Sequence, residues 1–205
     1  VNQTVQHPLY QWARKRLDDL CRSIPGIIIV DTPMSFDEVI AFYSCCDVFV
    51  SLHHAEGLGL HLMEAMTLGK PVIATAWSGN MDFTTKHNSC LVDYDTIAAR
   101  SPFNPLISPD KPALDTIWAE PRRDQAVAWM KKLAGDKKLR DTIGTRARAD
   151  MQKRGECIEA REVFRRCKDR WHEKISASRT TRVSAAAHTV RAAFKADTSR
   201  VSVLW

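Results

Sequence analysis

The chain of 205 residues, 44% of them hydrophobic, is long enough to bury one main core, and its formal net charge is +6. No apolar run approaches the roughly 20 residues of a membrane-spanning helix, and no N-terminal stretch resembles a signal peptide, so we expect a soluble, cytoplasmic protein. The six cysteines are thinly spread and form no C-x-x-C pair, which favours reduced thiols over a disulfide scaffold or a zinc site.

The basic charge is concentrated towards the C-terminus. Residues Lys153 to Trp205 contain thirteen Lys and Arg against six Asp and Glu, which leaves the preceding part close to neutral. Such an excess is typical of a solvated helix face, but also of a surface that meets anionic lipid, nucleic acid or an acidic partner. Few aromatic residues are interleaved with these charges, so we expect no nucleic-acid partner, whereas a peripheral contact with the inner face of a membrane stays open.

The first predicted element is a helix. Apolar residues recur at helical spacing among charged ones and predict an amphipathic helix from about Pro8 to Arg22. They are Leu9, Trp12, Leu17 and Leu20. Because a doubly wound domain ordinarily opens on a strand, we expect its first strands to be missing from this chain.

Short apolar runs bordered by turn residues then alternate with helical patterns. Ser35 is the expected cap of one helix, and Leu60 to Leu68 form the next. The predicted strands are Ile27–Val30, Val48–Val50, Val72–Ala74 and Cys90–Val92. This alternation predicts an α/β fold with a Rossmann-like parallel sheet flanked by helices.

The second half of the chain begins with a change in composition. Five prolines between Asp95 and Pro121 predict a long loop or insertion. Helical patterns resume over Arg122–Ala134, Lys137–Ile143 and about Glu156–Lys174. We therefore expect one main domain over residues 1–174, followed by a basic tail over residues 175–205.

The segment from Ser51 to Asp82 carries the most informative functional pattern. Loops beyond the carboxyl ends of parallel strands form the ligand crevice, so the turn after Val50 is expected to emerge there, with His54 lining the pocket. Gly57 and Gly59 border the next helix start, where backbone N–H groups and the helix dipole favour an anion such as a diphosphate. A plain tight turn explains the same two glycines.

Two carboxylates accompany this turn. Glu56 precedes the helix and Glu64 lies within it, so both can face the crevice. A carboxylate accepts short, charge-assisted hydrogen bonds from the paired hydroxyls of a ribose or a hexose, which makes a sugar-containing ligand a natural partner. The alternatives are an exposed helix residue for Glu64 and a favourable interaction with the helix dipole for Glu56.

Together these residues resemble the E-x7-E signature of family 4 type, or group 1, glycosyltransferases. The resemblance rests on Glu56-Gly57-Leu58-Gly59-Leu60, Glu64-Ala65-Met66 and Gly69-Lys70-Pro71-Val72-Ile73-Ala74. It continues through Ser78-Gly79-Asn80 and Asn88 to Val92, and more loosely through Trp118 to Pro121. It covers roughly Ile27 to Lys174.

The resemblance implies a GT-B architecture, in which two Rossmann-like domains face a cleft and the C-terminal one holds the sugar nucleotide. It implies that Glu56, the catalytic position, contacts the donor sugar and that Glu64 binds the ribose hydroxyls. Backbone N–H groups of the Gly-bearing turn would contact the sugar and the diphosphate: Gly57, Leu58, Gly59 and Leu60. Thr32, Pro33 and Met34 would line the base, and Ser78-Gly79-Asn80 would close the other side of the donor pocket.

The implied reaction is retaining transfer of a hexosyl group from a nucleoside diphosphate sugar to a glycan or lipid-linked acceptor, as in polysaccharide biosynthesis. The family usually has Pro at the position of His61, which we expect to be exposed or to touch phosphate. The diphosphate-clamping Arg and Lys and the N-terminal acceptor domain are expected to lie outside this chain, which alone should be inactive. A noncatalytic module for nucleotide sugars or anionic surfaces and a GT-B-like sugar-nucleotide epimerase are the alternatives.

One further motif bears on metal use. Asp93-Tyr94-Asp95 has the D-x-D spacing that is associated with divalent cations in the other major glycosyltransferase fold. GT-B enzymes do not generally require a metal, so we expect this motif to be a surface turn. We expect neither a metal nor a cofactor.

Overall fold

The computed structural model describes residues 8–30, 33–101, 116–155 and 203–204 and divides the chain into two units, Val1–Ser35 and Phe36–Trp205. The first unit contains α1 (Pro8–Ser23). Two ion pairs support this helix along its polar side, each between residues about one turn apart. They are Arg14–Asp18 at 3.1 Å and Lys15–Asp19 at 3.2 Å. The helix predicted over Pro8 to Arg22 is confirmed.

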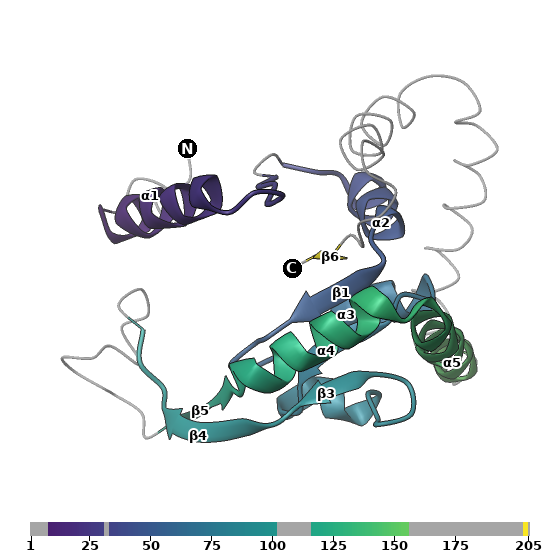
Figure 1. Ribbon diagram of the computed structural model, residues 1–205. Coiled ribbons are helices and arrows are strands. Elements are labelled where there is room, and N and C mark those ends of the chain that lie inside the picture. Colours follow the sequence, from purple (N-terminus) through teal and green to yellow (C-terminus); the bar gives the residue numbers. More distant parts are fainter. Residues whose placement is uncertain (1–7, 31–32, 102–115, 156–202, 205) are drawn as a thin grey trace. The chain divides into compact units, whose positions relative to one another are not determined.

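The second unit contains the remaining helices and strands (Figure 1). Its helices are α2 (Phe36–Cys45), α3 (Leu60–Thr67), α4 (Arg123–Gly135) and α5 (Lys137–Gly155), with a 3-10 turn, η2 (Ser78–Asp82). Its strands are β1 (Val48–Ser51), β2 (Val72–Thr75), β3 (Cys90–Val92), β4 (Tyr94–Ala98), β5 (Ile117–Pro121) and β6 (Val203–Leu204). The order β3-β2-β1-β6 forms one parallel sheet, and β4 pairs with β5 in an antiparallel hairpin. The predicted α/β fold, with a parallel sheet flanked by helices, is confirmed.

Each face of the parallel sheet has its own hydrophobic cluster because side chains alternate along the strands. On one face, Phe49 of β1 and Val72 of β2 pack with Leu62 and Met66 of α3. On the other face, Ile73 of β2 packs with residues of β3 and α4. All five of these side chains are buried. The strands are therefore almost wholly apolar, as expected of parallel strands covered on both faces.

Helix α5 fastens the C-terminal end of α3. The Arg148 guanidinium donates to the carbonyl oxygens of Leu68, at 2.7 Å, and Thr67, at 3.3 Å, where the helix leaves carbonyls without partners of its own. Gly69 then adopts a left-handed conformation, with φ +73°, and its carbonyl oxygen lies against Gly144 of α5. A Cβ atom on Gly144 would lie 2.1 Å from that oxygen. The contact therefore excludes any side chain at position 144.

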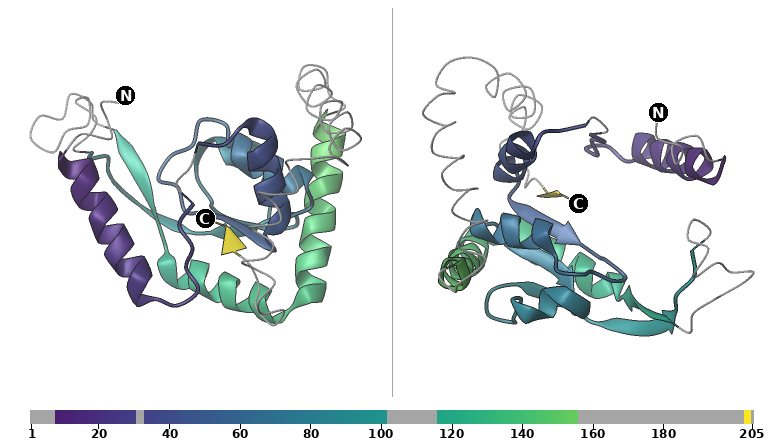
Figure 2. Two further views of the ribbon diagram at one scale, coloured as in Figure 1. Left: turned by 90° about the horizontal axis from the view of Figure 1, so that it is seen from above. Right: turned by 180° about the vertical axis from the view of Figure 1, so that it is seen from behind.

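Two predicted features differ in the structure. Residues Ile27–Val30 form no strand, and their side chains are exposed, because no other extended segment among residues 8–30 and 33–35 pairs with them. The ends of the segment predicted as a loop, from Asp95 to Pro121, instead form the strands β4 and β5. There, β-branched and aromatic residues such as Thr96, Ile97 and Trp118 favour pairing, and the strand ends at Pro121. Figure 2 shows that this hairpin continues from β3 and projects beyond the parallel sheet.

Cys90–Val92 is a strand, as predicted. The helix predicted over Lys137–Ile143 begins at Lys137 but continues to Gly155 as α5, so its predicted end was wrong. The helix predicted over about Glu156–Lys174 and nearly all of the basic tail lie outside the described residues.

The first prediction concerns the contact between α5 and the end of α3. We expect Gly144→Ala to lower the free energy of unfolding by about 1–3 kcal/mol, because the new methyl group overlaps the Gly69 carbonyl and forces the two helices apart. Urea denaturation followed by circular dichroism measures this change. Gly135→Ala is the matched control, since a Cβ atom there meets nothing within 4 Å. Equal stabilities for the two variants would contradict the contact.

Candidate functional site

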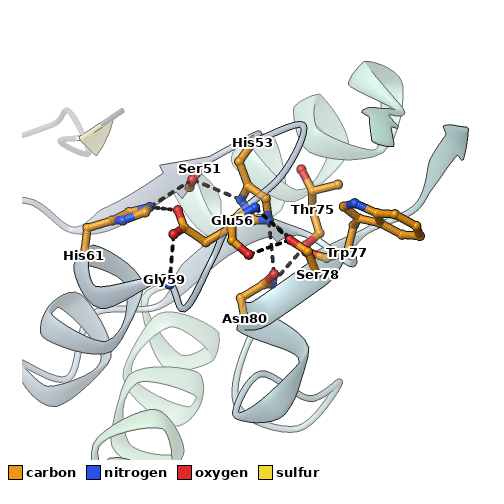
Figure 3. A network of polar contacts seen from close by, with 9 residues as sticks. All are labelled: Ser51, His53, Glu56, Gly59, His61, Thr75, Trp77, Ser78 and Asn80. Carbon is orange, nitrogen blue, oxygen red and sulfur yellow. Dashed lines mark hydrogen bonds and ion pairs between the residues drawn. The ribbon is translucent and has the colours of Figure 1, made fainter. Parts of the chain in front are cut away.

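The candidate site lies where β1 and β2 end. Because these strands are parallel neighbours, their carboxyl ends lie at one edge of the sheet. The chain leaves β1 at Ser51 and continues through His53 and Glu56 to α3, and it leaves β2 at Thr75 and continues to Ser78. Figure 3 shows the side chains of these two connections facing one another.

The two connections are held together by hydrogen bonds around Glu56. The backbone N–H of Glu56 donates to Ser78 Oγ at 2.7 Å, and Ser78 Oγ donates to the carbonyl oxygen of Glu56 at 2.9 Å. The backbone N–H of Gly79 donates to the same carbonyl oxygen at 3.0 Å. Ser78 adopts the left-handed region at φ +67°, unusual for a residue with a side chain. This strained turn thus braces the Gly-bearing loop that begins α3.

The two connections that follow β1 and β2 approach each other most closely at Gly79. A Cβ atom there would lie 2.0 Å from the carbonyl oxygen of Gly57 and 3.0 Å from that of Glu56. Both neighbours are backbone atoms, so no side-chain rotation can make room. Gly79 is therefore required by packing, whereas a Cβ atom on Gly57 would meet nothing within 4 Å.

The carboxylate of Glu56 is fixed at the start of α3. Its Oε1 accepts a hydrogen bond from the backbone N–H of Gly59 at 3.0 Å, and its Oε2 lies 3.7 Å from Nε2 of His61. Gly59 is the N-cap of α3, and its φ of +83° places the chain in the left-handed region that glycine tolerates best. An acidic group at a helix N-terminus is stabilised by the helix dipole. The structure therefore agrees with the alternative interpretation of Glu56, a favourable interaction with that dipole.

The second carboxylate, Glu64, lies along the same side of α3 as His61. Residues three apart on a helix are neighbours on its surface, so Glu64 follows His61 by about one turn. Glu64 is half-buried, and this burial raises its pKa because the ionised form loses solvation. Burial also raises the pKa of Tyr43 in α2, and the charge of Glu64 raises it further.

A chain of polar contacts crosses from α3 to η2 behind Glu56. Ser51 Oγ lies 3.3 Å from His61 Nε2 and 3.2 Å from His53 Nδ1. His53 Nε2 lies 3.1 Å from both the Trp77 carbonyl oxygen and Asn80 Oδ1. Asn80 is fully buried and donates from Nδ2 to the Thr75 carbonyl oxygen at 2.9 Å. His53 thereby joins both connections of the site (Figure 3).

The β4–β5 hairpin borders the site at His54. The backbone N–H of Ala119 donates to the carbonyl oxygen of His54 at 3.0 Å, and His54 Nε2 lies 3.3 Å from Glu120 Oε2. The His54 ring also meets the Trp118 ring edge-on, with centroids 5.3 Å apart. These neighbours were missed by sequence reasoning because the prolines obscured the alternation of β-prone residues around them. That alternation was the available signal.

Comparison with known proteins bears on this geometry. Residues 28–99 match the family model described as glycosyl transferases group 1. The resemblance to group 1 glycosyltransferases is confirmed. The matched segment contains both Glu56 and Glu64, and also Ser78 and Gly79.

A solved structure gives the same fold. It is the C-terminal domain of a glycosyl transferase group 1 family protein from Francisella tularensis, with a TM-score of 0.52 and 21% sequence identity. The match covers 72% of this chain and 64% of that one, so the chain spans less than two thirds of that structure. No curated protein matches the chain significantly. Within the part of the chain that the structure describes, no helix is both long and apolar enough to cross a bilayer.

The structure brings only some of the site residues implied by the glycosyltransferase resemblance together. Glu56, Ser78 and Gly79 contact one another directly, together with Gly57 and Gly59. Leu58 and Leu60 belong to the same loop and helix start, and both are exposed. Thr32 lies outside the described residues, and Pro33 and Met34 belong to the first unit, whereas every contact above comes from the second. The role of each residue in donor binding stays a prediction.

Asp93 and Asp95 of the D-x-D motif are exposed, as expected, but Tyr94 and Asp95 lie in a strand and not in a turn. Asp95 lies in β4, and its Oδ1 accepts from the Arg122 guanidinium at 2.9 Å, which lowers the pKa of this carboxyl. Asp93 accepts from the side chain of Gln125 at 3.0 Å. Strand pairing of Asp95 with Glu120 places the motif in the hairpin. No three His, Cys, Asp or Glu of the described ranges gather in a way that could hold a metal ion.

The second prediction tests the brace between the two loops. We expect Gly79→Ala to destabilise the fold by about 1–3 kcal/mol and to shift the backbone amide resonances of residues 56–59, because the methyl group overlaps the Gly57 carbonyl. Gly57→Ala is the control from the opposite side of the contact and should leave stability within about 0.5 kcal/mol. If Gly57→Ala were the more harmful change, the described packing would be wrong.

The third prediction concerns the charge of Glu64. Its raised pKa means that the folded chain keeps this proton to a higher pH than the unfolded chain does. The resulting stabilisation is complete below the unfolded pKa and is lost as the pH rises through the folded pKa. We therefore expect the melting temperature of Glu64→Gln, relative to the wild type, to increase from about pH 4 to pH 7.

Differential scanning fluorimetry over this pH series measures the effect. Asp141→Asn, at an exposed position of α5, is the control for loss of a negative charge. Parallel melting curves for the wild type and Glu64→Gln would show that Glu64 is not desolvated.

Proposed function

We propose that this chain is the donor-binding part of a retaining glycosyltransferase that transfers a hexosyl group from a nucleoside diphosphate sugar. The observation that carries the proposal is the position of the Glu56 carboxylate, which is fixed beside the N-terminus of α3 at the carboxyl ends of two parallel strands. This is where an open parallel sheet binds its ligand. The matched group 1 family model supports the transferase class.

The diphosphate of the donor would bind at the N-terminus of α3. Backbone N–H groups there point along the helix axis and carry a partial positive charge, which favours a phosphate anion. The N–H of Gly59 already donates to Glu56. Donor binding is therefore expected to exchange that hydrogen bond for one to phosphate and to free the carboxylate for the sugar hydroxyls.

Glu56 and Glu64 would then bind different parts of the donor. Glu56 would position the hexosyl group, while Glu64, about one turn along the same side of α3 from His61, would accept hydrogen bonds from the ribose hydroxyls. His54, beside the hairpin, would line the pocket. Catalysis would arise mainly from holding an acceptor hydroxyl beside the anomeric carbon and from stabilising the departing diphosphate.

Acceptor binding and the cationic side chains for the diphosphate would come from residues outside this chain. The acceptor is a glycan or a lipid-linked sugar, held by an N-terminal domain. The Arg and Lys that clamp the diphosphate follow the first strand of the donor-binding domain, which lies outside this chain. The enzyme works in the cytoplasm, in peripheral contact with the membrane where the acceptor is lipid-linked, and needs neither metal nor cofactor. Without the second domain, the chain is expected to bind donor weakly and to transfer little or no sugar.

The fourth prediction tests donor binding directly. The isotope-labelled chain is titrated with uridine, guanosine, adenosine and thymidine diphosphate sugars while its amide resonances are followed. We expect one base to shift the resonances of residues 56–60 and 78–80. Glu64→Ala should weaken that binding about 10- to 100-fold, because each lost charge-assisted hydrogen bond contributes about 1.5–3 kcal/mol.

Asp141→Ala is the matched control, since this carboxylate lies on the exposed side of α5 and pairs with Lys137. It should leave the affinity unchanged. Titrations with all four bases that leave residues 56–60 unshifted, or an affinity that does not respond to Glu64→Ala, would refute the proposed function.

A further inference from the structure

The β4–β5 hairpin brings residues of β5 to the candidate site. The backbone N–H of Ala119 donates to the carbonyl oxygen of His54 at 3.0 Å, which fixes the main chain of β5 to the connection that follows β1. The Trp118 ring meets the His54 ring edge-on, with centroids 5.3 Å apart. Glu120 Oε2 lies 3.3 Å from His54 Nε2. Consecutive residues of β5 therefore contact one residue of the site.

The two faces of β5 have different surroundings. Successive side chains of a strand point to opposite faces, so Trp118 and Glu120 share one face and Ala119 lies on the other. Ala119 is fully buried, whereas Trp118 is only partly covered. The side chains of His54 and Glu120 are 41% and 33% exposed. A ligand can therefore reach the face of the hairpin that lies beside His54.

The other strand of the hairpin is tied to the connection that follows β2. The ring of Trp77 in that connection meets the ring of Tyr94 in β4 edge-on, with centroids 4.9 Å apart. At the base of the hairpin, the backbone N–H of Arg122 donates to the carbonyl oxygen of Asp93 at 2.8 Å. Both connections of the site thus hold the hairpin, so its position beside them is set by the fold.

The exposed side chains of β5 suit a sugar ring. A pyranose presents C–H groups on its faces, which pack against an aromatic ring, and hydroxyl groups at its edge, which donate to a carboxylate. We propose that the β4–β5 hairpin forms a wall of the substrate site. Trp118 packs against a pyranose ring there, and Glu120 accepts hydrogen bonds from its hydroxyl groups.

The Glu120 carboxylate has acceptor positions left for these hydroxyl groups. Its Oε1 accepts a hydrogen bond from the Arg123 guanidinium at 3.1 Å, and its Oε2 faces His54. An ionised carboxylate has about four acceptor positions, so each oxygen can accept a further hydrogen bond.

The hairpin lies close to the position of Glu56 along the chain. Only Ala55 separates His54 from Glu56, and two residues of chain span at most about 7 Å. One sugar, or two sugars joined to each other, can therefore contact both Glu56 and the hairpin. This inference rests on the proposed function and deepens it, because it adds a sugar-binding element beside the residue that would position the hexosyl group.

The pyranose comes from one of two sources, the hexosyl group of the donor or a sugar of the acceptor. The isotope-labelled chain is titrated with the nucleoside diphosphate sugar that binds best and with the same nucleoside diphosphate without sugar. It is also titrated with the methyl α-glycosides of glucose, mannose and galactose, both alone and with saturating nucleoside diphosphate. The indole N–H resonance of Trp118 reports contact with the hairpin.

The decisive variant is Glu120→Gln, which keeps the shape of the side chain and removes its charge. We expect it to weaken binding of a sugar-containing probe about 3- to 10-fold and to leave binding of the nucleoside diphosphate unchanged. Weaker binding of the nucleotide sugar would identify the donor hexosyl group as the occupant. Weaker binding of a methyl glycoside alone would identify the acceptor.

Two further variants test the aromatic ring. Trp118→Leu should weaken the same probe over a similar range, and Trp118→Phe, which keeps an aromatic ring, should recover part of the loss. Thr96→Val is the matched control, because Thr96 pairs with Ala119 and so lies on the opposite face of the hairpin. The amide resonances of residues 94–98 and 117–121 report whether each variant keeps the hairpin.

The proposal is overturned if every sugar-containing probe binds Glu120→Gln and Trp118→Phe as tightly as the wild type and never shifts the Trp118 indole resonance. An equal loss of affinity in Thr96→Val would also overturn it, because the effect would then belong to the hairpin as a whole. If no nucleotide or nucleotide sugar binds, the proposed function is refuted. The methyl glycosides alone then decide: a Trp118 shift that Glu120→Gln weakens supports the sugar-binding hairpin, and no shift overturns it.

Discussion

The space above Gly79 is filled by the peptide backbone of the neighbouring loop, and the candidate site depends on that contact. The Gly57 carbonyl oxygen occupies the volume that a Cβ atom on Gly79 would need, and Ser78 donates and accepts hydrogen bonds across the same interface. Two connections that follow different strands are thereby joined at one edge of the sheet.

The parallel sheet fixes the points from which the two connections start. Because β1 and β2 are parallel and buried on both faces, their ends are fixed relative to each other by two separate hydrophobic clusters. Polar residues begin as soon as the strands leave these clusters, at Ser51 and His53. Asn80 is fully buried, yet its amide is satisfied by hydrogen bonds, so it links the loops at little cost.

Much of this could be predicted from local patterns. The apolar runs at Val48–Val50 and Val72–Ala74, and the helical spacing after Leu60, correspond to β1, β2 and α3 because burial on both faces leaves a clear signal. The pairing of β4 with β5 left a signal only in the alternation of β-prone residues, which does not identify a partner strand. The exposure of Ile27–Val30 could not be predicted, since it depends on whether a partner strand is present. The same holds for His61, whose contacts with Ser51 and Glu56 are set by tertiary structure.

Helix α3 is fastened at both of its ends. Arg148 and the Gly69–Gly144 contact hold its last turn, while Glu56 and the Gly59 conformation define its first. A helix of eight residues held in this way cannot slide along its axis or change its length. The first turn, where the Glu56 loop meets the helix that carries Glu64, and the last turn are therefore each fixed by separate contacts.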